Sequence, residues 1–145
     1  MTRTIISVPM RGLSRKGLIA GPGLDYGSGK GYDARAFWME QFDPHYSPEM
    51  PGGRFETIVC NYVLNVIESE AARLRVLRDI QFRLTDTGQA YITVRTDKAA
   101  LNGTTSIGTW QGLVVLNLPV VQRGPGFVTY LLTKSAQIGE SEQAA

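Results

Sequence analysis

Three glycines at alternate positions, just after an acidic residue, are the residues of this chain with the clearest chemical meaning. Gly27, Gly29 and Gly31 follow Asp25 within residues 24–31. Glycine is used where the backbone takes a positive φ or comes close to a ligand, because it has no Cβ. A glycine turn that leaves a strand and opens a helix presents backbone N–H groups to an electron-rich ligand. The spacing therefore predicts a ligand-binding turn, although an ordinary turn can have the same composition.

Two nucleotide-binding motifs do not fit this turn. The P-loop needs a glycine five residues before its Gly-Lys pair and Ser or Thr after the pair, and this chain has Leu24 and Gly31 there. The dinucleotide motif G-x-G-x-x-G needs a third glycine where this chain has Tyr32. That spacing disfavours a nucleotide-binding oxidoreductase. What remains is an acid, an alternating glycine turn and a second acid, Asp43, which follows 18 residues after Asp25.

Strands and helices that could position these residues alternate along the chain. The apolar pattern predicts four parallel strands, over residues 23–26, up to Asp43, over 55–62 and over 90–95. Helices are expected over residues 31–37 and 69–84, the second with Ser69 as its cap and Leu74, Leu77, Ile80 and Leu84 as its core stripe. The apolar runs 113–121 and 127–132 flank a Gly-Pro-Gly turn and predict a hairpin. This order predicts an α/β fold with a mostly parallel sheet and a C-terminal antiparallel hairpin.

Polar or glycine-rich residues follow each predicted parallel strand. These stretches are residues 26–29, 43–46, 61–65 and 95–97. In an open α/β sheet, ligands bind beyond the carboxyl ends of the strands. We therefore expect the four stretches to line one binding site.

The glycine turn with its two acids resembles motif I of the class I S-adenosylmethionine-dependent methyltransferases. Over about residues 22–132 the chain is also similar to a bacterial and phage group of such proteins, some of them associated with DNA phosphorothioation systems. The strings that carry this similarity are residues 24–31, 43–46, 61–67 and 108–111. The resemblance implies a single Rossmann-like methyltransferase domain that binds S-adenosylmethionine and is shortened in the middle, with the third strand missing.

The same resemblance implies roles for particular residues. The expected cofactor-binding residues are Asp25, Tyr26, Gly27, Ser28, Gly29, Asp43, Pro44, His45 and Asn61. Gly27 and Gly29 would contact the methionine end of the cofactor, and Asp43 would bind the ribose hydroxyls. Asn61 and Tyr62 are the expected catalytic residues, because they could orient an acceptor amine or hydroxyl by hydrogen bonds. Tyr62 could equally be a core aromatic residue.

Catalysis needs little beyond alignment, because the sulfonium methyl group is already activated. His45 is the one histidine of the chain and could act as a base, stack near the adenosine or face solvent; Asp97 is another candidate base.

Residues 43–46 also resemble the D-P-P-Y motif of amino-methyltransferases that act on DNA adenine. They follow the second strand rather than the fourth, so we interpret them as cofactor-binding.

Composition and charge limit the number of domains and indicate how the two ends of the chain behave. A chain of 145 residues with 43% hydrophobic residues and a net charge of +2 is one domain with a real core. Residues 1–20 carry only basic charges and are expected to be a solvated arm or an edge strand, with a slight preference for nucleic acid as partner. Residues 134–145 are expected to be a frayed polar tail, and the arginines of the 69–84 helix to face solvent. We also expect the arm, or a second subunit in a homodimer, to cover the exposed edge at Asp43.

The single cysteine, Cys60, lies in an apolar run, which fits a reducing compartment. The sequence has no apolar leader and no membrane-length apolar run, so we expect no membrane association and a cytoplasmic location. The alternative to a methyltransferase is a catalytically silent module that binds S-adenosylmethionine, which the missing strand would favour. Calorimetry with S-adenosylmethionine, S-adenosylhomocysteine and NAD would separate these hypotheses.

Overall fold

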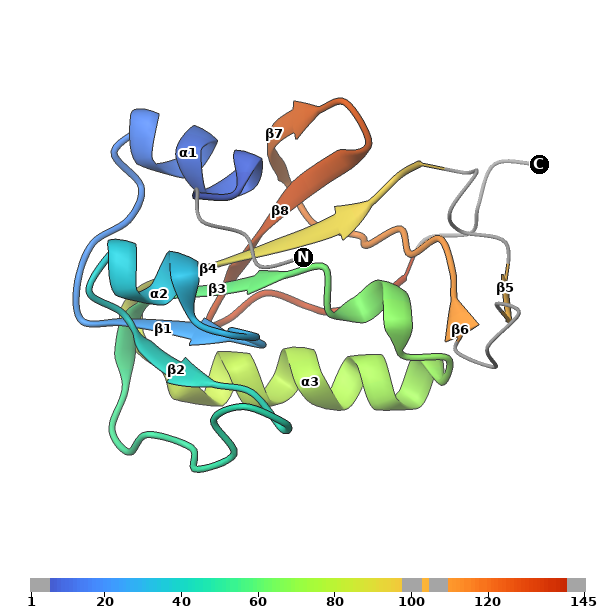
Figure 1. Ribbon diagram of the computed structural model, residues 1–145. Coiled ribbons are helices and arrows are strands. Elements are labelled where there is room, and N and C mark those ends of the chain that lie inside the picture. The colour runs from blue at the N-terminus through green and yellow to red at the C-terminus, as the bar shows by residue number, and fades with distance from the viewer. Residues whose placement is uncertain (1–5, 98–102, 105–109, 141–145) are drawn as a thin grey trace.

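A six-stranded sheet divides the molecule into two faces (Figure 1), with two short helices over one face and one long helix over the other. The computed structural model describes residues 6–97, 103–104 and 110–140. The strand order is β2-β1-β3-β4-β8-β7. The ends of the predicted arm and tail, and part of the 108–111 string, lie outside the described residues.

The first four strands are parallel and the last two are antiparallel. They are β1 (Gly23–Tyr26), β2 (Glu40–Phe42), β3 (Phe55–Asn61), β4 (Leu84–Arg95), β7 (Val120–Gly124) and β8 (Phe127–Thr133). A separate small pair joins β5 (Gly103–Thr104) to β6 (Trp110–Gln111). The helices are α1 (Val8–Arg15), α2 (Tyr32–Ala36) and α3 (Glu70–Arg83), and η1 (Leu64–Val66) is a 3-10 turn.

The predicted fold class is confirmed. A mostly parallel sheet ends in an antiparallel pair, and no strand of this sheet lies between β2 and β3, a stretch that the structure describes in full. The hairpin is shorter than predicted, because residues 113–119 do not join the sheet. Val114 and Leu116 of that segment are instead buried in the main core, and Pro119 has no N–H to donate to a strand ladder.

Helix α3 covers one face of the sheet through most of its predicted apolar stripe; Leu74 is the exception, because it is only partly buried and belongs to neither core cluster. Leu77 and Ile80 of the helix are fully buried in the main core, with Leu84 just beyond its end. Ser69 caps the helix as expected, accepting a hydrogen bond from the Ala72 N–H at 3.2 Å. Within the described residues, no helix has the length and apolar character that a membrane span needs.

Residues 85–88, which lie between the predicted helix and the predicted strand, form an irregularity inside β4. The register between β3 and β4 shifts from the Phe55–Leu84 pair to the Thr57–Gln89 pair. A Cβ added to Gly88 would lie 2.7 Å from the Phe55 carbonyl oxygen, and a backbone atom cannot easily move away. The irregularity at residues 85–88 therefore allows β4 to begin at Leu84, directly after α3.

Gly88→Ala is expected to lower the free energy of unfolding by about 1–3 kcal/mol, the usual cost of overpacking. Urea denaturation measures the change. Gly52→Ala is the matched control, because nothing lies within 4 Å of the Cβ that it would add. Equal stability of both variants would contradict the tight packing at this irregularity.

Residues 8–15 of the basic N-terminal segment form a helix rather than a solvated arm or an edge strand. Met10 and Leu13 of α1 are fully buried in a cluster with Val59 and Tyr91 of the central strands. The Gln122 side chain of β7 donates to the Pro9 carbonyl at 3.0 Å. This packing takes α1 to the edge of the sheet opposite β2, so the expectation that it covers β2 is wrong.

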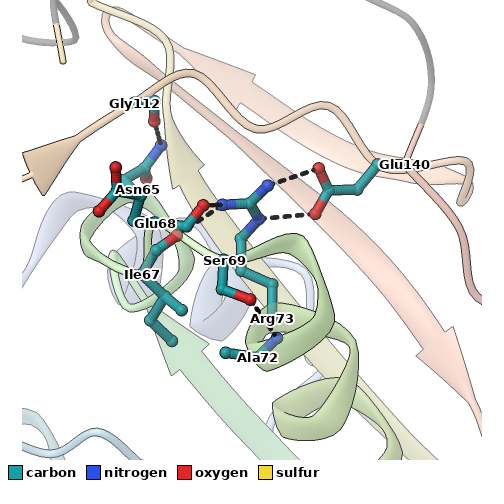
Figure 2. A network of polar contacts seen from close by, with 8 residues as sticks. All are labelled: Asn65, Ile67, Glu68, Ser69, Ala72, Arg73, Gly112 and Glu140. Carbon is teal, nitrogen blue, oxygen red and sulfur yellow. Dashed lines mark hydrogen bonds and ion pairs between the residues drawn. The ribbon is translucent and has the colours of Figure 1, made fainter.

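The polar tail is held as far as Glu140. Arg73 is 7% exposed, and its guanidinium binds both carboxylate oxygens of Glu140 at 2.6 and 3.0 Å (Figure 2). The same guanidinium donates to the carbonyls of Ile67 and Glu68 at 2.5 and 2.9 Å. The expectation of a solvated Arg73 and a frayed segment before residue 141 is therefore wrong, because the two charges pair across the molecule.

Candidate functional site

A hollow of about 290 Å³ lies at the carboxyl ends of β1 and β3. It is lined by the glycine turn, the first residues of α2, the end of β3 and the residue that precedes α1. The lining residues are Ser7, Asp25, Gly27, Ser28, Gly29, Lys30, Tyr32, Asp33, Asn61 and Tyr62. The structure thus brings together residues from two of the four stretches that were expected to share one site.

The glycine turn needs its glycines. Gly27, Gly29 and Gly31 have φ values of 89°, 55° and 85°, a region that residues with a Cβ rarely adopt. The turn is tied to β2, because the N–H groups of Gly27 and Ser28 both donate to the Phe42 carbonyl, at 2.7 and 3.0 Å. The predicted tight turn is therefore present, and β2 fixes its position.

Asp43 lies directly after β2 and holds the glycine turn from the other side. Its Oδ2 accepts the N–H of Gly29 at 2.9 Å. Its Oδ1 accepts the N–H groups of His45 and Tyr46 at 2.9 and 3.0 Å. Partial burial would raise the pKa of Asp43, but these three backbone hydrogen bonds outweigh burial and lower the pKa below its ordinary value. The two acids of the motif therefore belong to one structural unit with the turn.

Asp43→Asn is expected to be less stable than the parent protein at pH 7, with the difference disappearing in acid. A carboxyl group whose pKa is lowered on folding stabilises the protein above its unfolded-state pKa of about 3.9. This stabilisation is lost as the pH falls through the lower folded-state value. Urea denaturation at pH 7, 5, 4 and 3 measures the gap between the two proteins. A gap that stays constant down to pH 3 would contradict the assignment.

Three side chains of the hollow carry buried polar atoms without a hydrogen-bond partner. These atoms are Oγ of Ser7, Oγ of Ser28, and both Oδ1 and Nδ2 of Asn61. Buried polar atoms are normally hydrogen-bonded, and leaving one unpaired costs about 1–3 kcal/mol. Ser7 occupies the N-cap position of α1 but makes no capping hydrogen bond. Convergence of unpaired donors and acceptors on one hollow indicates a site for a polar ligand.

Two buried carboxylates give the hollow its charge. Asp25 and Asp33 are 4% and 5% exposed, and Asp33 Oδ1 accepts the N–H of Ser7 at 2.9 Å. Lys30, which also lines the hollow, is exposed. Carboxylates in such surroundings favour a cationic group such as an ammonium or a sulfonium. The hollow therefore suits a ligand that carries both positive charge and several polar groups.

The sequence interpretation missed Ser7 and Asp33. A serine followed by proline at the second helical position is a helix-start signal, and it correctly marks α1. That signal could have placed Ser7 at a helix end, but nothing local indicates that α1 would meet the glycine turn.

Of the expected cofactor-binding residues, Tyr26, Asp43, Pro44 and His45 are not among those that line the hollow. Successive residues of a strand point to opposite faces, so Asp25 reaches the hollow whereas Tyr26 packs toward α3. There the Tyr26 hydroxyl donates to Asp79 at 2.8 Å, and burial together with this carboxylate raises the Tyr26 pKa. Pro44 and His45 are exposed, and the His45 ring lies edge-on to Tyr46.

A second hollow, of about 420 Å³, adjoins the carboxyl ends of β3 and β4. Its lining residues are Tyr62, Arg95, Asp97, Pro125 and Gly126, so Tyr62 lines both hollows. Tyr62 has a φ of 63°, a strained conformation that clusters at binding sites in proteins. Its N–H donates to the Thr93 carbonyl at 2.8 Å, which ties it to β4 at the point where the two hollows meet.

Asn65 braces the end of β4 and is 1% exposed. Its Oδ1 accepts the N–H of Arg95 at 2.6 Å, and its Nδ2 donates to the Gly112 carbonyl at 2.8 Å. The Gly112 N–H in turn donates to the Asn65 carbonyl at 2.9 Å. The Asn65 side chain thus joins β4 to the segment after β6.

No protein-family model and no curated protein matches the sequence. Solved structures do share its fold. The DhpI–SAH complex has a TM-score of 0.54 and 12% identity, over 85% of this chain and 83% of that chain. The DhpI–SAM–HEP complex has a TM-score of 0.55 and 13% identity, over 86% and 87%. A TehB-like SAM-dependent methyltransferase from Corynebacterium glutamicum has a TM-score of 0.53 and 17% identity, over 87% of both chains. The chain therefore has a Rossmann-like methyltransferase fold.

Proposed function

We propose that this protein binds S-adenosylmethionine in the hollow beneath the glycine turn and transfers its methyl group to an acceptor. The observation that carries the proposal is the convergence of unpaired polar atoms of Ser7, Ser28 and Asn61 on that hollow. The similar solved structures named above include complexes with SAH and SAM, which supports the same ligand class. Similarity to the phage and phosphorothioation-associated group remains a prediction.

The residues present fit this cofactor at both of its polar ends. Its amino-acid end carries an ammonium and a carboxylate, which suit the buried Asp25 and Asp33 and the unpaired donors of Asn61 and the two serines. Its ribose would lie near Asp43. A carboxylate offers about four lone-pair sites, and three are used by backbone N–H groups. Asp43 is therefore expected to accept one ribose hydroxyl, through Oδ2, rather than two.

The role of the protein's own residues is to align the cofactor and the acceptor. The bound cofactor supplies a methyl group on a positively charged sulfur, ready for displacement by a lone pair of the acceptor. Asn61 is held at the end of β3, and Tyr62 lies between the two hollows. We expect Asn61 to hold the cofactor and Tyr62 to orient the acceptor. Holding reactants in line can supply much of the rate enhancement without a strong base.

Isothermal titration calorimetry with S-adenosylmethionine, S-adenosylhomocysteine and NAD tests the proposal. Binding of the first two without NAD is the expected result. Absence of binding to both adenosyl compounds would end the methyltransferase interpretation, and selective binding of NAD would replace it with an oxidoreductase.

A catalytically silent S-adenosylmethionine-binding module is the second candidate. The observation that favours it is the shortened sheet, in which the fully described residues between β2 and β3 contain no strand. A methyl-transfer assay with the labelled cofactor and the acceptors considered below distinguishes the two. Tight binding without transfer to any small molecule or nucleic acid would support the silent module.

A further inference from the structure

We propose that the second hollow binds the methyl acceptor, and that this acceptor is a small molecule bearing a carboxylate, which Arg95 recognises. The inference rests on the proposed function. It deepens that function by naming a substrate class, in place of the nucleic acid that the basic N-terminal segment had suggested.

Position is the first argument. Tyr62 lines both hollows, so a molecule in the second one lies next to the cofactor hollow. The far wall is the β7–β8 turn, with Pro125 and Gly126, and it is fixed because the Thr96 N–H donates to the Gly126 carbonyl at 2.9 Å. A volume of about 420 Å³ lies within the range of small-molecule sites.

The availability of the Arg95 guanidinium is the second argument. Its one charge partner within the described residues is Asp97, with 3.8 Å between Nη2 and Oδ2, which is beyond hydrogen-bonding distance. The two side chains are 39% and 50% exposed, so the pair is weak and solvent-screened. The fork of N–H donors on Arg95 therefore remains available for bidentate binding of a carboxylate.

The size of the hollow and the guanidinium of Arg95 together indicate the class of ligand. A hollow of about 420 Å³ holds a small molecule rather than a length of nucleic acid. The planar fork of an arginine matches a carboxylate in geometry and charge. This combination favours a small carboxylate over a nucleic acid backbone.

Rigid presentation is the last argument. Asn65 accepts the Arg95 N–H at 2.6 Å and also donates to the Arg95 carbonyl at 3.4 Å. Arg95 is also paired with Phe127 in the sheet. The guanidinium thus projects from a braced strand end, and sites on rigid elements discriminate ligands better than sites on loops.

The test uses the full chain saturated with S-adenosylhomocysteine. Calorimetry then compares 4-hydroxybenzoate with 4-hydroxybenzamide and lactate with lactamide, pairs that match in shape and differ in charge. At least one carboxylate is expected to bind about tenfold more tightly than its amide. Arg95→Gln should remove this difference and leave S-adenosylhomocysteine affinity unchanged. Arg75→Gln, an exposed arginine of α3, should preserve both properties.

Each other outcome counts against the proposal. Equal binding of carboxylates and amides, or the same carboxylate preference in Arg95→Gln, would overturn it while the proposed function stands. Binding of a single-stranded oligonucleotide, with both carboxylates inert, would overturn it in favour of a nucleic acid acceptor. A protein that does not bind S-adenosylhomocysteine at all would overturn the proposed function and this inference together.

Discussion

Asn61→Leu is expected to weaken S-adenosylhomocysteine binding by about 100-fold without destabilising the protein. The Asn61 amide makes no hydrogen bond in the described structure, although both of its polar atoms are buried. Two hydrogen bonds to a charged ligand contribute about 3 kcal/mol, and each 1.4 kcal/mol is tenfold in affinity. Leucine has a similar size and no unpaired polar atoms. The free energy of unfolding should therefore stay the same or rise by about 1 kcal/mol.

Calorimetry gives the affinity, and urea denaturation of the ligand-free protein gives the stability. Asn117→Leu is the control, because Asn117 is exposed and lies outside both hollows. A loss of stability in Asn61→Leu would mean that the amide has a structural partner. Unchanged affinity in a stable variant would remove Asn61 from the ligand site.

Arg73→Ala is expected to lower the free energy of unfolding by about 3–5 kcal/mol, as removal of one partner from a buried ion pair usually does. The side chains of Arg73 and Glu140 are 9% and 14% exposed. Truncation would leave the Glu140 carboxylate, and the carbonyls of Ile67 and Glu68, without their donor (Figure 2). The guanidinium also lies 5.5 Å from the centre of the Trp110 ring, so packing is lost as well.

Urea denaturation measures the loss. Arg75→Ala, on the exposed side of the same helix, should change the free energy of unfolding by less than about 0.5 kcal/mol. The double variant Arg73→Met with Glu140→Leu should recover a substantial part of the loss, because it removes both charges together. If the single and double variants were equally unstable, the unpaired charge would not be the cause.

Local requirements explain which parts of this molecule could be predicted from the sequence. The alternating glycines predicted a tight turn, because positive φ values at Gly27, Gly29 and Gly31 are a property of those positions alone. The apolar stripe of α3 and the cap at Ser69 are likewise local. The structure links the turn to the second acid of the motif directly, because the Gly29 N–H donates to the Asp43 carboxylate at 2.9 Å.

The features that could not be predicted depend on contacts between distant parts of the chain. Ser7 reaches the hollow because its N–H bonds to Asp33, 26 residues away. Arg73 is buried because Glu140 meets it from 67 residues away, although its position on the helix suggested solvent. No hydrophobic periodicity in either segment predicts these long-range contacts. Tyr26 differs, because the alternation of side chains along β1 points it away from the hollow, where its hydroxyl donates to Asp79, 53 residues away.

The brevity of β2 limits how much open sheet edge this fold presents where a strand is missing. An uncovered border of a sheet is hazardous when it is long, because its free amides and carbonyls can recruit a neighbour. Here that border has three residues, and a reversal from Asp43 to Ser47 closes it at once. So short an edge presents few backbone groups to another chain, which lowers the aggregation hazard that the missing strand would otherwise create.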